Sequence, residues 1–189
     1  ILSSITHGVS SRRLLDVGCG DGFFMLGAKR KGWEVMGTEL HPHPARALGM
    51  DVRESIEEIH ETMRFDCITL WHSLEHMKDI KPTLTRLSTL LHRSGRLIIS
   101  VPDNGSWQAG LFGPRWLHLD VPRHLYHFDV ASLEHGLDIA GFTVERLRHD
   151  ELEHDLMGWS QSTLNSVYST PNVFLDFFMG KGKAHPTWK

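Results

Sequence analysis

The glycine-rich stretch after the first apolar run constrains the fold of this chain more than any other feature. Residues 14–17 form a short apolar run of the kind found in parallel strands that are buried on both faces. Gly18, Gly20 and Gly22 follow it at alternate positions. Glycine permits the positive φ angles and the close backbone approach that a tight turn requires. The stretch therefore predicts a strand, a glycine turn and a helix that opens at Gly22, an arrangement that presents main-chain N–H groups to a ligand.

An acidic residue ends the second apolar run, at the position where its carboxylate would bind the hydroxyls of a ribose. Glu39 ends the stretch 33–39 and lies 17 residues after Gly22. In nucleotide-binding α/β units, an acid about 20 residues beyond the glycines accepts hydrogen bonds from ribose hydroxyls. The structural alternatives are a glycine turn that binds nothing and a solvated acid that leads into a helix.

The spacing of the glycines disfavours a nicotinamide dinucleotide. A G-x-G-x-x-G fingerprint would need a small residue at position 23 for close helix–strand packing, and this chain has Phe23 there. Instead the glycines run G-x-G-x-G and follow Asp16. The segment 16–22, D-V-G-C-G-D-G, resembles the first motif, [D/E]-x-G-x-G-x-G, of the class I S-adenosylmethionine-dependent methyltransferases.

A later block carries the same likeness. Residues 123–144 follow the pattern R-H-L-Y-H-F-D-x-x-S-L-x-x-x-L-x-x-A-G-F-x-V, which resembles a bacterial subgroup of small-molecule methyltransferases, of types 11, 12 and 23. The resemblance covers about residues 12–148. It implies an α/β, Rossmann-like, doubly wound and mostly parallel sheet of seven strands with helices on both faces. The last strand would be antiparallel.

Hydrophobic patterning places the other elements and gives a βαβαβαβαβ order, which implies right-handed crossovers and helices on both faces. Ligands bind beyond strand carboxyl ends at the switch point of such sheets, which the first and fourth strands flank in this topology. We therefore expect residues 71–76, after the fourth strand, to lie beside the cofactor. The expected strands are 14–17, 34–38, 50–52, 65–70, 96–101 and 142–147, and the expected helices are 22–31, 41–48, 55–60, 80–94, 130–140 and 156–168.

The length of 189 residues suits one methyltransferase domain over residues 1–189. Its core is expected at about 12–148, with a substrate-side loop or lid at 103–128 and a C-terminal extension at 149–189. The chain starts at Ile1 without a methionine and ends just after an apolar patch at 173–179, so we expect an excerpt of a longer protein with a truncated extension.

Charge and cysteine content indicate the setting. The net charge is −3 with no basic tract, which disfavours nucleic acid as a partner. Cys19 and Cys67 form no close motif, so we expect both to be free thiols and the protein to reside in a reducing compartment. With no visible signal peptide or spanning helix, we expect a cytoplasmic protein.

The resemblance implies S-adenosylmethionine as cofactor and S-adenosylhomocysteine as product. The glycine turn would lie under the methionine part, Glu39 would bind the ribose hydroxyls, and Leu40 or His41 would flank the adenine; Glu54 or Ser55 is a weaker candidate for the adenine edge. The expected cofactor contacts are Asp16, Gly18, Cys19, Gly20, Gly22, Glu39, Leu40, Trp71 and His72.

A metal is not expected, although some quinone-pathway relatives use acidic and histidine residues near this position with a divalent ion. His72, Glu75 and His76 would share one helical face. Two or three ligands within one turn, with no partner motif, make a poor metal site.

The acceptor implied by the resemblance is a small molecule such as a sugar, a quinone precursor or a lipid-linked intermediate. We expect methylation of oxygen in slight preference to other atoms. Methyl transfer needs mainly proximity and orientation, and a neutral histidine can take the proton of a hydroxyl or an amine. Each candidate could instead be a structural, hydrogen-bonded histidine. We favour His124 and His127, followed by His72, over the other candidates, His76 and His118.

Arg123 could hold an anionic acceptor, or it could pair with Asp120 or Glu134. The aromatic loop 107–117 and the patch at 173–179 could form a lid, contact a membrane surface or simply cover the core. The expected acceptor-binding residues are Trp107, Trp116, Arg123 and Tyr126.

Two other functions compete with the methyltransferase interpretation. One is a non-catalytic relative of the fold that serves as an interaction module. The other, disfavoured by Phe23, is an oxidoreductase of the NAD type.

Overall fold

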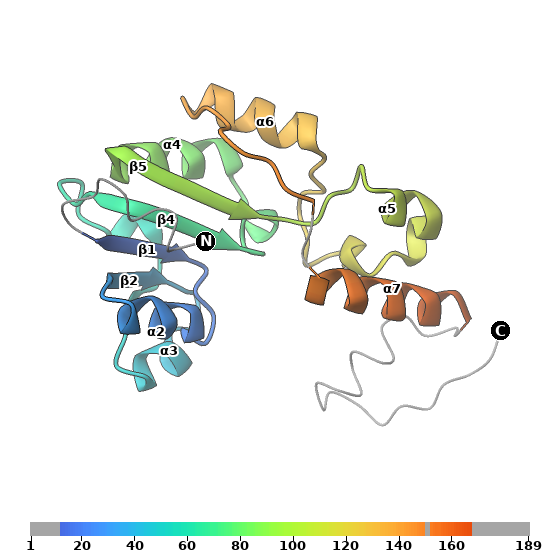
Figure 1. The fold of residues 1–189 in the computed structure, drawn as a ribbon, viewed down its shortest axis with the longest axis horizontal. Coiled ribbons are helices and arrows are strands. Elements are labelled where there is room, and N and C mark those ends of the chain that lie inside the picture. The colour runs from blue at the N-terminus through green and yellow to red at the C-terminus, as the bar shows by residue number, and fades with distance from the viewer. Residues whose placement is uncertain (1–11, 150–151, 168–189) are drawn as a thin grey trace. The chain divides into compact units, whose positions relative to one another are not determined.

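The computed structural model describes residues 12–149 and 152–167, which fall into two compact units (Figure 1). The unit called here the sheet unit comprises residues up to Val101 together with His135–Thr143. The unit called the helical unit comprises Pro102–Glu134 and the residues from Val144 onward. The apolar patch expected at 173–179 lies outside the described residues.

Five parallel strands make the sheet, and their order confirms the doubly wound arrangement. The order is β3-β2-β1-β4-β5, so that β1 lies between β2 and β4 and the winding reverses there, as expected. Ladder pairs run from Arg13↔Glu34 to Val17↔Thr38 between β1 and β2. The strands are β1 (Arg13–Val17), β2 (Glu34–Thr38), β3 (Asp51–Arg53), β4 (Phe65–Trp71) and β5 (Leu91–Ser100).

Helices follow the strands and bury one apolar side each. They are α2 (Phe23–Arg30), α3 (His43–Ala47) and α4 (Ile80–Leu90), which contact β2, β3 and β5 respectively (Figure 1). Leu84, Leu87 and Leu90 of α4 are fully buried, and each such side chain contributes about 1.5–3 kcal/mol. Ala28 of α2 packs in a core cluster with Leu14, Trp33 and Cys67.

Two expected boundaries are corrected. Helix α4 ends at Leu90 instead of residue 94, because β5 begins at once: Leu91 pairs with Phe65 of β4. The next pair is Cys67↔Arg96, so residues 92–95 bulge out of the ladder between these pairs. In place of the helix expected at 55–60 the chain forms a short 3₁₀ turn, Ile56–Glu58.

The expectation of seven strands is wrong for the described residues, which form a five-stranded sheet. Residues 142–147, expected as the sixth strand, form no ladder. Phe142 donates its N–H to Leu137 at the end of helix α6 (Val130–Ile139), and Val144 and Leu147 are exposed. A strand needs a partner for its backbone groups, and in the described residues β5 pairs with β4 alone.

The helical unit contains more regular structure than its sequence pattern indicated. Its elements include helix α5 (Trp107–Phe112), two 3₁₀ turns (Gly113–Arg115 and Leu117–Leu119) and α7 (Leu152–Val167). The indole of Trp159 on α7 contacts the rings of Trp107 and Phe112, with centroids 4.5 Å and 5.4 Å away. No helix in the described part of the chain is long and apolar enough to cross a membrane.

Candidate functional site

The glycine turn after β1 adopts the conformation that its sequence predicts. Gly18, Gly20 and Gly22 have φ angles of 74°, 55° and 82°. Two of them also lack room for a side chain: a Cβ on Gly18 would lie 2.5 Å from Cβ of Ser73, and one on Gly22 would lie 2.9 Å from Cβ of Ala45. The turn therefore requires glycine for its conformation and for its space.

Thr38, the last residue of β2, and Glu39, the next residue, hold the glycine turn through its main-chain N–H groups. The carbonyl oxygen of Thr38 accepts hydrogen bonds from Gly18 at 2.8 Å and from Cys19 at 3.0 Å. The Glu39 carboxylate accepts one from Gly20 at 3.0 Å through Oε2 and one from His41 at 3.2 Å through Oε1. Glu39 thus faces the turn from the end of the neighbouring strand.

Asp16 lies buried in β1, just before the turn. Burial raises the pKa of its carboxyl from 3.8 to about 6, and the hydrogen bond from the Thr69 hydroxyl, at 2.7 Å, acts in the opposite direction. Because Asp16 and Thr69 form the last pair of the β1–β4 ladder, this contact also fixes the two strand ends against each other.

Cys19 contributes to the turn through its backbone, with its thiol packed inward. Its side chain occupies space next to Gly37 of β2, where a Cβ would lie 2.8 Å from Cys19 Sγ. Burial, with added repulsion from Asp16 and Glu39, raises the pKa of the thiol to about 12. The thiol therefore stays protonated near neutral pH.

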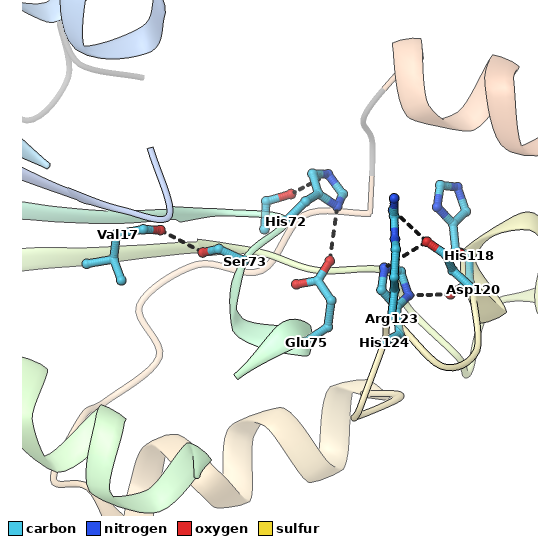
Figure 2. Close-up of polar contacts among 9 residues, drawn as sticks. Val17, His72, Ser73, Glu75, His118, Asp120, Arg123 and His124 are labelled. Atoms are coloured by element: carbon cyan, nitrogen blue, oxygen red, sulfur yellow. Dashed lines mark hydrogen bonds and ion pairs between the residues drawn. The ribbon is translucent and has the colours of Figure 1, made fainter. Parts of the chain in front are cut away.

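The carboxyl end of β4 turns sharply (Figure 2). The ring of Trp71 lies 5.3 Å from that of Phe24, and its Nε1 is buried with no hydrogen-bond partner in the described residues. His72 has a φ of 48° and donates its N–H to Ser100 at 2.9 Å, while its Nδ1 lies 3.6 Å from Oε1 of the buried Glu75.

In the helical unit, hydrogen bonds fix the tautomers of the two favoured histidines. Nδ1 of His124 lies 2.7 Å from the carbonyl oxygen of His118, which can only accept, so Nδ1 carries the proton (Figure 2). The same argument places the proton of His127 on Nε2, which lies 2.7 Å from the Leu119 carbonyl oxygen. Each neutral ring then has its lone pair on the other nitrogen.

The residues expected at the acceptor also lie in the helical unit. Arg123 pairs with Asp120 at 2.6 Å, one of its two expected partners, and His124 Nε2 lies 3.9 Å from the same carboxylate oxygen (Figure 2). Trp107 is 72% exposed, whereas Trp116 is 5% exposed and donates from Nε1 to Gln108 at 2.7 Å. The ring of Tyr126 stacks on Phe128, with centroids 6.0 Å apart.

The structure gathers all nine expected cofactor residues in the sheet unit, at the carboxyl ends of β1, β2 and β4. His72 is among them. The candidate base His76 also lies in the sheet unit, whereas His118, His124, His127 and the expected acceptor residues lie in the helical unit.

Sequence reasoning missed four residues that support the turn. The available signal was a small hydroxyl residue in or just after a strand for Thr38, Thr69 and Ser73, the last within the expected segment 71–76. For Gly37 it was a glycine inside β2.

The family described as methyltransferase domain matches residues 5–147 of this chain. The ubiquinone biosynthesis O-methyltransferase of Pectobacterium atrosepticum is 24% identical over 136 residues, which cover 65% of this chain and 56% of the relative. The enzyme of the same name from Alkalilimnicola ehrlichii is 29% identical over 130 residues, covering 61% and 53%. The chain thus spans about half the length of these two curated relatives.

Solved structures share the fold. An S-adenosylmethionine-dependent methyltransferase from Mesorhizobium loti superposes with a TM-score of 0.62 at 18% identity, covering 87% of this chain and 90% of that one. One from Archaeoglobus fulgidus gives 0.60 at 20% identity, covering 87% and 84%. With the matched family, the glycine turn and the strand order in agreement, this chain belongs to the methyltransferase domain family and has the class I methyltransferase fold.

Proposed function

We propose that this chain binds S-adenosylmethionine at the carboxyl edge of the sheet unit and methylates a small-molecule acceptor, with oxygen as the preferred atom. The observation that carries the proposal is the Glu39 carboxylate, which faces the glycine turn across the β1–β2 edge and contacts Gly20 at 3.0 Å. This is the placement that an acceptor for two ribose hydroxyls requires.

The residues present fit such a cofactor on three counts. Gly20, in the middle of the turn, has a φ of 55°, and a Cβ there would meet nothing within 4 Å, so the space beside the turn is open. Both oxygens of Glu39 contact main-chain N–H groups at 3.0 Å and 3.2 Å, and can accept from ribose hydroxyls in addition. The buried Nε1 of Trp71, without a partner in the described residues, is a donor available at the end of β4.

S-adenosylmethionine, when bound, supplies an activated methyl group. The chain's own part is to hold and orient the two reactants and to take a proton from the acceptor. Asp16, the glycine turn with Cys19, and Glu39 would hold the methionine and ribose parts, and the exposed Leu40 would flank the adenine. Trp71 and His72 would line the same edge.

His124 is our preferred base, with His127 and then His72 as alternatives. Its Nδ1 proton is committed to the His118 carbonyl oxygen, so the lone pair of the neutral ring lies on Nε2 and can accept a proton there. Trp107, Trp116, Tyr126 and Arg123 remain proposed acceptor contacts, although the 2.6 Å pair with Asp120 already engages the guanidinium of Arg123.

The names of the relatives support a choice of the acceptor class to test first. Because the two curated relatives carry the name of O-methyltransferases of ubiquinone biosynthesis, a quinone precursor is the first acceptor to test. Sugars and lipid-linked intermediates follow, the last with contact at a membrane surface. The proposal includes no metal and no nucleic acid. The two free, buried cysteines support a cytoplasmic setting.

The proposal keeps residues 1–189 as one methyltransferase domain. In support, the matched family region 5–147 spans most of the sheet unit and the part of the helical unit that includes residues 103–128, the proposed substrate-side loop.

Calorimetric titration with S-adenosylhomocysteine tests the cofactor site. We expect micromolar binding by the unmodified chain and a loss of roughly 2 kcal/mol, about 30-fold, in Glu39→Ala, because a charged hydrogen-bond acceptor is removed. Glu34→Ala is the matched control: Glu34 is an exposed acid at the other end of β2, and its loss should leave the affinity unchanged.

Absence of binding by the folded, unmodified chain would contradict the proposal. Binding of NAD in its place would favour the oxidoreductase interpretation. Tight binding of S-adenosylhomocysteine, with no methyl transfer to phenol, sugar or lipid-linked acceptors, would favour a non-catalytic module.

A further inference from the structure

We propose that Ser73 is a positioning residue that holds the glycine turn in its cofactor-binding conformation. It does so by joining the turn after β4 to the turn after β1. The inference rests on the proposed function of the glycine turn and extends it to a residue that does not itself touch the cofactor.

The link is a short, buried hydrogen bond. The hydroxyl of Ser73 donates to the carbonyl oxygen of Val17 at 2.7 Å, and Ser73 is 8% exposed (Figure 2). Val17 is the last residue of β1, and the β1–β4 ladder has its last pair one residue earlier, at Asp16↔Thr69. Ser73 therefore supplies the next connection between the two strand ends, beyond the ladder itself.

One peptide group is held at both of its polar atoms. Ser73 binds the carbonyl oxygen of Val17, and the N–H that follows, on Gly18, donates to the Thr38 carbonyl oxygen at 2.8 Å. A peptide group is planar, so bonds at both of its polar atoms fix its rotation about the chain. This peptide group opens the glycine turn, and its rotation sets the direction in which the turn leaves β1.

The Ser73 methylene also fills the space beside Gly18. A Cβ on Gly18 would lie 2.5 Å from Cβ of Ser73 and 3.2 Å from its Oγ. The two residues are in direct contact, so Ser73 excludes a side chain at position 18, in addition to the φ of 74° that already favours glycine there. The polar bond and this contact together restrain the first residue of the turn.

The backbone of His72, the residue before Ser73, directs Ser73 toward the end of β1. His72 has a φ of 48°, which a non-glycine residue adopts only where the surroundings enforce it. The enforcing contacts come from the neighbouring strand: the His72 N–H donates to the Ser100 carbonyl oxygen at 2.9 Å, and Nε2 lies 3.3 Å from Ser100 Oγ. The chain thus bends away from β4 at His72, and Ser73 lies against the end of β1 (Figure 2).

Ser73→Ala tests the inference, because it removes the hydroxyl and keeps the Cβ against Gly18. We expect the Kd for S-adenosylhomocysteine to rise about tenfold, since the buried Val17 carbonyl loses its side-chain donor and the peptide group is released. With a turnover assay, the KM for the methyl donor should rise while kcat at saturating donor stays within about twofold.

Ser88→Ala is the matched control, because its hydroxyl also donates to a backbone carbonyl oxygen, that of Thr85 at 2.8 Å, on the exposed side of α4. Its Kd should equal that of the unmodified chain. Ser73→Cys keeps the bulk and a weak donor, and should give an intermediate Kd. Urea unfolding of each variant separates affinity from stability.

The outcomes are distinct. If the unmodified chain does not bind, the proposed function fails, and this inference with it. If the unmodified chain binds and Ser73→Ala binds equally tightly, Ser73 is merely structural and this inference alone fails. Should Ser73→Ala not fold, full affinity in Ser73→Cys would overturn the inference and reduced affinity would support it.

Discussion

Glu39 and Gly20 are joined by a 3.0 Å hydrogen bond from the glycine N–H to the carboxylate, which connects the end of β2 to the turn after β1. Thr38, the preceding residue, binds Gly18 and Cys19 of the same turn. The second strand therefore shapes the turn and also presents the acid that would receive a ribose. A variant at this edge can therefore change the affinity for the cofactor by altering the turn or by removing the ribose acceptor. Each such variant needs a matched control.

Asp16 should make the stability of the sheet unit depend on pH. Its folded-state pKa of about 6 lies above 3.8, the ordinary pKa of an aspartate carboxyl group. The stability that Asp16 contributes is therefore fully present below pH 4 and is lost as the pH rises through 6. A shift of this size corresponds to about 3 kcal/mol. Asp16→Asn should remove this slope in urea unfolding between pH 4 and 7.5. Parallel pH profiles for the variant and the unmodified chain would contradict the prediction.

Gly37→Ala should destabilise the sheet unit by about 1–3 kcal/mol, because the new Cβ would lie 2.8 Å from Cys19 Sγ and from Met25 Sδ. The measurement is the free energy of unfolding in urea. Gly27→Ala is the control: Gly27 lies inside α2, and a Cβ added there would have nothing within 4 Å, so alanine should stabilise the helix by about 0.5–1 kcal/mol. Equal effects of the two variants would argue against the close approach of β2 to the turn.

Trp116→Phe should destabilise the helical unit by about 1–3 kcal/mol. The variant removes the buried Nε1 donor and leaves Oε1 of Gln108 without its 2.7 Å partner. Trp107→Phe, at a site that is 72% exposed, should change the unfolding free energy by less than about 0.5 kcal/mol. A larger loss of unfolding free energy in Trp107→Phe than in Trp116→Phe would contradict the prediction that Trp116 belongs to the core of the helical unit.

His124→Gln should lower kcat by about 10²–10⁴ if this ring is the base, and should leave the Kd for S-adenosylhomocysteine unchanged. His60→Gln, at an exposed histidine that contacts Thr62, is the control for general effects of the substitution. Loss of activity in His127→Gln with full activity in His124→Gln would transfer the role to His127.

The sequence by itself determined the strand, turn and helix around Gly18, Gly20 and Gly22, and it placed Glu39 opposite them. These features are local: apolar runs set the strands, and glycine sets the turn. The place of the residues after the fourth strand, beside the glycine turn at the switch point, also followed from the alternation of strands and helices. Four strands were recognised to within one residue of their observed bounds, and the fifth, expected from residue 96, begins at Leu91.

The tertiary structure alone decided how distant residues meet. Residues 142–147 had the pattern of a strand but form no ladder, because a strand depends on a partner that its own sequence does not contain. Helix α4 ends at Leu90 because Leu91 pairs with Phe65, far along the chain. Ser73 binds the carbonyl oxygen of a residue 56 positions away. Local sequence sets propensity and spacing, but hydrogen-bond partners that far apart are chosen only when the strands pair.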